Sequence, residues 1–307
     1  MKIIVTGGAG FIASHLVDRL IHLGHRVVVV DDLSTGKRKN LNPRAKFYRL
    51  DIGSAKLAAV FKKERPQVVF HLAAQMSVRQ SVADPLFDSR VNILGSINLL
   101  EQCKKYKVKK IIFSSTGGAL YGEAPRQFLP TRESYPAQPL SPYGIAKLSV
   151  EYYLNYYYEI FGLRFVALRF SNVYGPRQNA HGEAGVVAIF CDAVLHQRRA
   201  VINGTGQQTR DYVFVGDVVN AAILAMRKNV VGSFNIGTGK ETSVNDIFKK
   251  IVKAAGVQIS PKYGAAKEGE QRRSALHCGR ARQQLGWQPQ VSLEQGIGKT
   301  VRWFAEQ

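Results

Sequence analysis

The chain has few of the residues that build extracellular or membrane proteins. Its 307 residues include only three cysteines, Cys103, Cys191 and Cys278, whose odd number and wide spacing argue against a disulfide scaffold and a zinc site. We therefore expect free thiols, no metal and a cytoplasmic location. Unbroken apolar runs are only a few residues long, far below the ~20 residues of a membrane-spanning helix. Because the first residues already read as a strand and a glycine loop, no signal peptide is expected.

Acidic residues are also scarce relative to basic ones. Lys and Arg number 43 against 22 Asp and Glu, so the formal net charge is +21. Such an excess raises nucleic acid as a class of partner. The basic residues are dispersed, however, and no zinc finger, RNA-recognition motif or basic arm accompanies them. We therefore predict a basic solvated surface that attracts small anionic substrates, and no nucleic-acid partner.

The first 32 residues carry the pattern of a dinucleotide-binding unit. An apolar strand over 2–6 leads into a glycine loop over 7–10, and an amphipathic helix follows as far as Gly24. Glycines allow the backbone to turn tightly and to approach a pyrophosphate at the helix N-terminus. A second strand then ends in Asp31-Asp32, where a carboxylate accepts hydrogen bonds from the adenosine ribose and repels a 2′-phosphate. The pattern favours NAD over NADP; a purely structural βαβ unit is the alternative.

Strands and helices alternate along the first 170 residues and less regularly afterwards. This alternation predicts an α/β fold: a Rossmann-type doubly wound parallel sheet, with ligands at the carboxyl ends of its strands. From residue 171 we expect a smaller C-terminal α/β substrate domain, 171–307, some of whose segments return to the first sheet. The expected strands are 2–6, 26–30, 46–50, 68–72, 110–114, 164–170, 209–213 and 232–236. The expected helices are 57–63, 85–106, 143–161, 216–226 and 244–255.

The segment from Ser141 to Lys147 carries the clearest candidate for chemistry. Ser141 can cap a helix whose first turn suits Pro142, which places Tyr143 and Lys147 one turn apart on one face. A lysine ammonium beside a phenol favours the phenolate, so we expect the pKa of Tyr143 to fall. Such a tyrosine can take a proton from a sugar hydroxyl and return it. The alternative is an ordinary helix with one aromatic residue and one solvated lysine.

Three further segments have candidate roles. Hydroxyl side chains at 114–116 follow a predicted strand, where they can hold a substrate oxygen beside Tyr143. Arg210, within a short predicted strand, can clamp a phosphate. Tyrosines at positions 152, 153, 156, 157 and 158 crowd the helix that begins near Tyr143. With the helix over 85–106 they suggest a two-fold helix-bundle interface, so we expect a homodimer.

These motifs, taken in order, resemble the extended short-chain dehydrogenase/reductase family of nucleotide-sugar enzymes. The resemblance runs from the glycine loop through 114–116, Tyr143-x-x-x-Lys147 and the loop over 172–178 to the segment at 285–287. Within the family the pattern resembles most the shorter 4-epimerases, isomerases of galactose metabolism that interconvert UDP-glucose and UDP-galactose. It implies a tightly held NAD that is not consumed. Tyr143 would take the proton of the sugar 4-hydroxyl while hydride leaves C4, and the keto sugar would turn before both return.

The resemblance also implies roles for individual residues. The catalytic residues would be Tyr143, Lys147 and Thr116. NAD would be bound by Gly7, Gly10, Phe11, Ile12, Asp31, Asp32, Ser34, Thr35, Gly36, Asp51, Ile52, Leu72, Ala73, Ala74, Gln75, Asn92, Ser114, Tyr143 and Lys147. The UDP-sugar would be bound by Thr116, Tyr143, Asn172, Val186, Val187, Val201, Arg210, Lys267, Arg273 and Ser274.

Some positions depart from the family pattern, and several activities stay open. Lys267 stands where an arginine is usual, so we expect Arg273 to help hold the diphosphate. The small Ser274 is expected to admit N-acetylated sugars. A 4,6-dehydratase needs an Asp-Glu pair after Thr116, where this chain has Gly117-Gly118. The pattern also leaves room for a UDP-glucuronate 4-epimerase, a net reductase or a catalytically silent nucleotide-binding protein.

Overall fold

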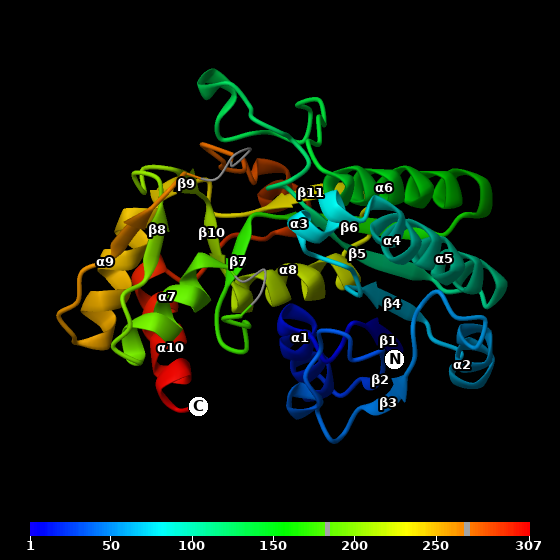
Figure 1. The fold of residues 1–307 in the computed structure, drawn as a ribbon. Coiled ribbons are helices and arrows are strands. Elements are labelled where there is room, and N and C mark those ends of the chain that lie inside the picture. The colour runs from blue at the N-terminus through cyan, green and yellow to red at the C-terminus, as the bar shows by residue number, and fades with distance from the viewer. Residues whose placement is uncertain (182–184, 267–270) are drawn as a thin grey trace.

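A seven-stranded, all-parallel sheet forms the centre of the molecule. The computed structural model describes residues 1–181, 185–266 and 271–307, and its strands follow the order β11-β6-β5-β4-β1-β2-β3 (Figure 1). The change in direction between β1 and β4 is the switch point at which doubly wound sheets bind ligands. The strands are β1 (Lys2–Thr6), β2 (Arg26–Asp31), β3 (Lys46–Arg49), β4 (Val68–His71), β5 (Lys110–Thr116), β6 (Arg164–Phe170) and β11 (Gly232–Ile236).

Helices cover both faces of this sheet, which explains why its strands are almost continuously apolar. Alternate residues of each strand face opposite layers, so Ile3 and Ile4 belong to two different cores. One face packs against α1 (Phe11–His22) and α8 (Val215–Arg227). The other packs against α2 (Leu57–Glu64), α5 (Gly95–Lys105) and α6 (Pro142–Phe161). The predicted Rossmann-type fold is confirmed.

The predicted helix over 85–106 is present, but a wider turn interrupts it. After α3 (Val78–Ala83), α4 (Pro85–Ser89) continues through a π-helical turn, Arg90–Leu94, into α5. Turns of this kind are rare and concentrate at functional sites. The turn contains Asn92, one of the residues expected to bind the cofactor. Single helical turns also occur at Arg38–Asn40, Arg126–Phe128 and Ala281–Leu285.

A second core lies beyond the sheet. There α7 (Val186–Leu195), α9 (Val244–Ala255) and α10 (Leu293–Ala305) pack together, on the left in Figure 1. Three two-stranded ladders accompany them: β7 (Asn172–Tyr174) with β10 (Tyr212–Phe214), β9 (Thr209–Arg210) with β12 (Thr242–Ser243), and β8 (Val201–Asn203) with β13 (Lys262–Gly264). Although both follow residue 171, β11 is a strand of the central sheet and α8 packs on one face of it. The division into 1–170 and 171–307 stays a prediction.

The structure differs from the sequence-based expectation at two strands, β5 and the segment over 209–213. Strand β5 extends to Thr116, so the three hydroxyl residues belong to the strand rather than to a loop. The expected strand over 209–213 is divided at Asp211, whose buried carboxylate accepts backbone hydrogen bonds from Thr238, Gly239 and Leu276. Within the described ranges, no helix is long and apolar enough to cross a membrane.

Candidate active site

The glycine loop packs tightly against the end of β4. Gly7 has a φ of +70°, and a Cβ placed on it would lie 2.7 Å from the backbone nitrogen of Ala73. Gly10 donates its N–H to the Gly7 carbonyl at 2.9 Å and begins α1 without a side-chain cap. The first-turn amides of α1, from Phe11 onward, therefore face the loop as an anion site. The methyl group of Ala13, where a third glycine is common, is buried in the core.

Asp31 supports this loop from the end of β2. Its buried carboxylate accepts hydrogen bonds from the backbone N–H of Ala9 at 2.9 Å and of Leu33 at 2.8 Å. A side chain at Gly36 would approach Asp31 Oδ1 to 2.8 Å, so the following loop folds closely over it. Asp32 is exposed and accepts from both the N–H and the hydroxyl of Ser34. The expected Ser34, Thr35 and Gly36 therefore lie beside the aspartate pair.

The backbone after β4 is held from two sides. The Thr6 hydroxyl accepts the N–H groups of Leu72 and Ala73, and the Asn92 side chain accepts from the N–H and donates to the carbonyl of Gln75. These bonds fix the stretch from Leu72 to Gln75, which contains the two small residues Ala73 and Ala74, at the carboxyl edge of the sheet. At the end of β3, Asp51 is exposed and Ile52 is buried.

A buried histidine connects these two supports. His71 Nδ1 lies 2.9 Å from the Thr6 hydroxyl, and Nε2 lies 2.8 Å from the Ser96 hydroxyl, which donates to the Asn92 carbonyl. Because Thr6 already accepts two N–H groups, its own proton goes to Nδ1, and the ring proton therefore sits on Nε2. Burial lowers the pKa of His71 to about 3, so the ring is neutral.

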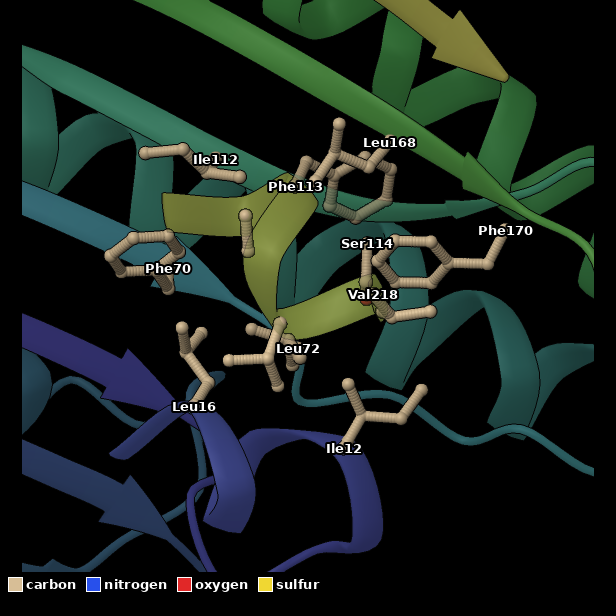
Figure 2. Close-up of a pocket in the computed structure, with 12 residues that line it drawn as sticks. Ile12, Leu16, Phe70, Leu72, Ile112, Phe113, Ser114, Leu168, Phe170 and Val218 are labelled. Atoms are coloured by element: carbon tan, nitrogen blue, oxygen red, sulfur yellow. The ribbon is translucent and has the colours of Figure 1, made fainter. Parts of the chain in front are cut away.

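Three of the predicted cofactor residues line a small apolar cavity beneath the site. The cavity, of about 10 Å³, lies between the sheet, α1 and α8, and Ile12, Leu72 and Ser114 form part of its wall (Figure 2). The side chains of Ile12 and Leu72 point into this cavity together with Phe70 and Ile112. We infer that Ile12 and Leu72 present backbone rather than side-chain atoms to a ligand at the sheet edge.

The start of α6 follows the sequence-based expectation. The Ser141 hydroxyl accepts the N–H of Gly144 at 3.2 Å, and Pro142 occupies the first turn. A Cβ on Gly144 would lie 2.7 Å from the carbonyl oxygen of Ala119, so this turn packs directly on the loop after β5. The close approach brings Tyr143 toward the end of the strand that carries Thr116.

The ammonium of Lys147 lies close to the ring of Tyr143. It is 5.8 Å from the centroid of the Tyr143 ring, and it donates to the Ser114 carbonyl at 2.9 Å. It also lies 4.7 Å from the centroid of the Phe113 ring. Burial lowers the pKa of Lys147 to about 8, an effect partly offset by the carboxylates of Asp88 and Glu151.

The expectation that Lys147 lowers the pKa of Tyr143 is wrong for the protein by itself. Burial raises the pKa of Tyr143 above its ordinary value, and the carboxylate of Asp88 raises it further. Asp88 is fully buried on α4, where Oδ1 accepts from Gln75 and Asn92, while Oδ2 has no partner within the described structure. The sequence analysis missed this third charged group because it is separated from Lys147 by 59 positions along the chain.

Thr116 closes the end of β5. Its hydroxyl accepts the N–H of Ala119 at 3.1 Å, which shapes the turn through Gly117 and Gly118. A Cβ on Gly118 would lie 3.9 Å from both Thr116 Oγ1 and Asn172 Oδ1. The Thr116 hydroxyl and the side-chain oxygen of Asn172, which is exposed on β7, therefore lie near the same point beside Gly118. Both residues were expected to contact substrate.

Other predicted substrate residues differ in what they offer. Val187 is 1% exposed, and its side chain lies within the second core. The predicted UDP contact of Val186 and Val187 would therefore use the first-turn amides of α7, and it stays a prediction. Val201 is exposed on β8. Ser274 is buried beside Ala275, whose carbonyl accepts the N–H of Thr131.

The basic residues expected at the diphosphate already have protein partners. Arg273 donates from Nε and Nη2 to the two carboxylate oxygens of Glu241, and Glu241 also accepts the Thr209 hydroxyl. Arg210, next to Thr209, donates to the Thr209 carbonyl at 2.8 Å. The sequence analysis did not anticipate the pairing of Arg273 with Glu241, and the expected contact of Arg273 with the diphosphate stays a prediction. Lys267 lies outside the described residues.

Taken together, the described residues fit NAD. The loop approach at Gly7 leaves no room for a Cβ, the first turn of α1 has unused amides, and Asp31 stands at the ribose end of β2. Tyr143 and Lys147 lie at the carboxyl edge of the same sheet.

Comparison with known proteins agrees with this geometry. Residues 3–237 match the model of the NAD dependent epimerase/dehydratase family. The chain belongs to this family. A family member from Mycolicibacterium smegmatis, a UDP-glucose 4-epimerase, is 46% identical over 99% of this chain and 98% of its own length.

Two solved structures illustrate the likeness. The UDP-glucose 4-epimerase of Thermotoga maritima, solved with UDP-glucose, is 50% identical with a TM-score of 0.98, covering 100% of this chain and 99% of the other. The UDP-glucose 4-epimerase of Thermus thermophilus, solved with NAD, is 42% identical with a TM-score of 0.94, covering 99% of both chains. The likeness thus extends to the whole chain, beyond the 235-residue stretch that the family model covers.

Proposed function

We propose that this chain is an NAD-dependent UDP-glucose 4-epimerase, which interconverts UDP-glucose and UDP-galactose by transient oxidation at C4 of the sugar. The observation on which the proposal rests is the Tyr143–Lys147 pair at the carboxyl ends of the parallel strands. The glycine loop, whose backbone leaves no room for a side chain at Gly7, lies at the same end of the sheet. The epimerase relatives, matched over their full length, support the same reaction. When bound, NAD supplies a cationic ring that accepts the C4 hydride and gives it back.

Tyr143 would act as the acid–base group. Its phenolate would take the proton of the sugar 4-hydroxyl, and the same phenol would return the proton to the 4-oxygen after the sugar has turned. Because burial and Asp88 hold the pKa of Tyr143 high, the phenolate needs positive charge beside it. Lys147, fixed by the Ser114 carbonyl, supplies one such charge at all pH values below about 8.

Thr116 and the substrate-side segments would orient the sugar nucleotide. The Thr116 hydroxyl still has its proton to donate after accepting the Ala119 N–H, so it can bond the 4-oxygen. Asn172, the amides at the start of α7, Val201 and Arg210 would hold the UDP group, and Arg273 would join them by exchanging Glu241 for phosphate. We assign this role to residues 171–307, and the cofactor to 1–170.

The architecture disfavours the dehydratase alternative. Elimination of water requires an acid directly after Thr116, and a Cβ on Gly117 would already lie 2.5 Å from the Leu276 side chain. An aspartate at this position would therefore displace Leu276. The epimerase proposal needs no group at 117.

We also propose a homodimer in the cytoplasm. Large apolar side chains are exposed on α3, α4, the π turn and α6, which pack against one another. A two-fold copy would bury this surface as a helix bundle. The exposed residues include Val82, Leu86, Leu94, Tyr152, Tyr156 and Ile160. The cytoplasmic location rests on the three free thiols.

The deciding experiment is incubation of purified protein with UDP-galactose and no added cofactor. Appearance of UDP-glucose would support both the reaction and a retained NAD, whereas stoichiometric consumption of added NADH would indicate a reductase. Parallel reactions with UDP-N-acetylglucosamine and UDP-glucuronate test the sugar range. Because Ser274 is small, we expect turnover of the N-acetylated sugar; its absence beside good turnover of UDP-glucose would count against a role for Ser274.

A further inference from the structure

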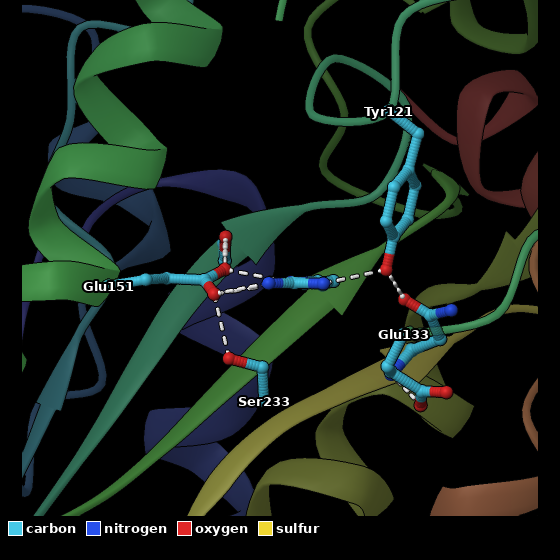
Figure 3. Close-up of polar contacts among 7 residues, drawn as sticks. Tyr121, Glu133, Glu151 and Ser233 are labelled. Atoms are coloured by element: carbon cyan, nitrogen blue, oxygen red, sulfur yellow. Dashed lines mark hydrogen bonds and ion pairs between the residues drawn. The ribbon is translucent and has the colours of Figure 1, made fainter. Parts of the chain in front are cut away.

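A buried carboxylate lies one helical turn beyond Lys147. Glu151 is 7% exposed, and it joins α6 to three strands of the sheet. It accepts hydrogen bonds from the Ser115 hydroxyl on β5, from the Arg169 guanidinium on β6 and from the Ser233 hydroxyl on β11. Figure 3 shows Ser233 and further polar contacts, drawn as dashed lines, meeting at the two oxygens of Glu151.

The contact with Ser115 matters because of its neighbours. Ser114 accepts the Lys147 ammonium through its carbonyl, and Thr116 closes the same strand. Lys147 and Glu151 therefore attach α6 to two consecutive residues of β5, Ser114 and Ser115. Two attachments one turn apart fix both the rotation of the helix and its position along the strand.

Arg169 extends the network toward the substrate side. It donates from Nη1 to the Tyr121 hydroxyl at 2.8 Å, and that hydroxyl donates to Asn235 Oδ1 at 2.8 Å (Figure 3). Asn235 in turn donates to the carbonyl of Thr131 at 2.9 Å, and through its backbone N–H to Glu133 at 2.8 Å. All of these side chains except Glu133 are buried.

The far end of the network anchors a substrate segment. Thr131 pairs with the backbone of Ala275 and His277, directly after Ser274. The loop over 127–136 and His277 also wall a hollow of about 690 Å³. One continuous set of hydrogen bonds thus runs from the Tyr143–Lys147 helix to the chain beside the expected sugar pocket.

We propose that Glu151 is a positioning residue of the reaction and that Arg169 and Tyr121 couple the catalytic helix to the segment beside Ser274. The inference rests on the proposed function for its kinetic part. Glu151 touches no reacting atom; it holds Tyr143 and Lys147 against β5. Arg169 neutralises Glu151, because a buried carboxylate needs a paired cation and hydrogen bonds to its lone pairs. Arg169 also bonds the Tyr121 hydroxyl, so a displacement of Glu151 would also displace Tyr121.

The alternative is a network that only stabilises the fold. The chain offers a matched control, Glu64, another buried glutamate with several partners: the Lys2 and Lys46 ammonium groups and the Tyr48 hydroxyl. Glu64 lies at the amino-terminal edge of the sheet, away from the site. A stabilising role predicts that Glu151→Gln and Glu64→Gln behave alike.

The kinetic test compares these variants for UDP-galactose turnover by the holoenzyme. We expect Glu151→Gln to lower kcat roughly tenfold to a hundredfold with little change in KM, because small displacements of reacting groups have costs of this size. Tyr121→Phe should mainly raise KM, and the double variant should lose less than the two losses combined. Ser233→Ala, which removes one bond, should give a smaller loss in kcat than Glu151→Gln and serves if that variant does not fold.

Hydrogen exchange tests the coupling without relying on turnover. In Glu151→Gln, or in Ser233→Ala, the backbone amides of Thr131 and His277 should exchange faster, although they lie far from residue 151 along the chain. In Glu64→Gln they should exchange as in the wild type. Unchanged exchange at these amides, or a folded Glu151→Gln with wild-type kcat, overturns the proposal. If the wild-type protein shows no epimerase turnover, the proposed function is wrong. The hydrogen-exchange comparison then still tests whether Glu151 is coupled to Thr131 and His277.

Discussion

The Lys147 ammonium lies 5.8 Å from the centroid of the Tyr143 ring, and yet the pKa of Tyr143 is raised. Burial removes the phenol from water, and the negative charge of the Asp88 carboxylate opposes the formation of a phenolate. The lysine therefore does not by itself produce a reactive phenolate. In this site the tyrosine is kept protonated until further positive charge enters, which ties its acid–base chemistry to the bound state.

Replacing Tyr143 tests its role directly. Tyr143→Phe should lower kcat for UDP-galactose by about 10² to 10⁴, because the proton transfer loses its partner. The ring remains, so the cofactor should stay bound, which absorbance of the supernatant after denaturation measures. Full activity in this variant would contradict the mechanism.

The charge on Asp88 should be visible in the pH profile. Asp88→Asn removes a carboxylate that raises the pKa of Tyr143, so the acid limb of the kcat profile should move to lower pH. Glu64→Gln, remote from the site, should leave the profile where it is. An unshifted acid limb in Asp88→Asn would mean that the carboxylate does not act on the tyrosine.

Glu64 should contribute to stability in a defined pH range. Although burial opposes it, hydrogen bonds from Lys46, Tyr48 and Lys2 hold the pKa of Glu64 at about 2, below its usual 4.5. The contribution is complete above pH 4.5 and is lost as the pH falls through 2. Glu64→Gln should therefore lower the free energy of unfolding at pH 7 by about 2 kcal/mol.

Denaturant titrations at several pH values check this expectation. The difference between wild type and Glu64→Gln should shrink between pH 4.5 and 2. A difference that stays constant over this range would show that lost packing, rather than the ionised carboxylate, is responsible.

Two glycines with the same backbone conformation should respond differently to a methyl group. Gly7 and Gly24 have φ values of +70° and +79°, but only Gly7 faces backbone atoms, with Ala73 N 2.7 Å from a placed Cβ. Gly24→Ala should cost about 1 kcal/mol of stability and leave NAD bound. Gly7→Ala should also displace the loop and abolish cofactor retention. Equal NAD content in the two variants would argue against the loop as its binding site.

The proposed dimer can be disrupted at its centre. Tyr156 is 48% exposed and Leu86 is 76% exposed on neighbouring helices. Tyr156→Asp with Leu86→Glu should convert a particle of twice the 34.0 kDa chain mass into a single chain in sedimentation. A wild-type protein that sediments as one chain at micromolar concentration would remove the dimer.

Most helices and strands of the fold could be predicted from local patterns in the sequence. The strand over 2–6, the helix over 244–255 and the Ser141 cap lie where residue spacing placed them, because each depends on neighbours in sequence. The extent of β5 was harder to predict. Its hydroxyl residues are typical of loops, and only pairing with Arg169 and Phe170 of β6 keeps them extended.

The site was predictable in its residue types and less so in its electrostatics. Tyr143 and Lys147 follow from one helical turn, but the direction of the tyrosine pKa depends on Asp88, which only the packing of α4 on α6 brings near. Likewise, nothing near Arg273 in sequence indicates Glu241. Contacts between distant segments decide such pairs, and composition or periodicity does not encode them.

The pairing of Arg273 with Glu241 sets a condition on the proposed binding of a diphosphate. Glu241 holds the guanidinium through two oxygens, in the geometry that a phosphate also uses. A ligand that takes over the guanidinium must present two acceptor oxygens of its own and leave Glu241 to the Thr209 hydroxyl. The proposed contact with the diphosphate of a sugar nucleotide therefore requires Glu241 to give up the guanidinium, and a monodentate anion would replace only one of its two hydrogen bonds.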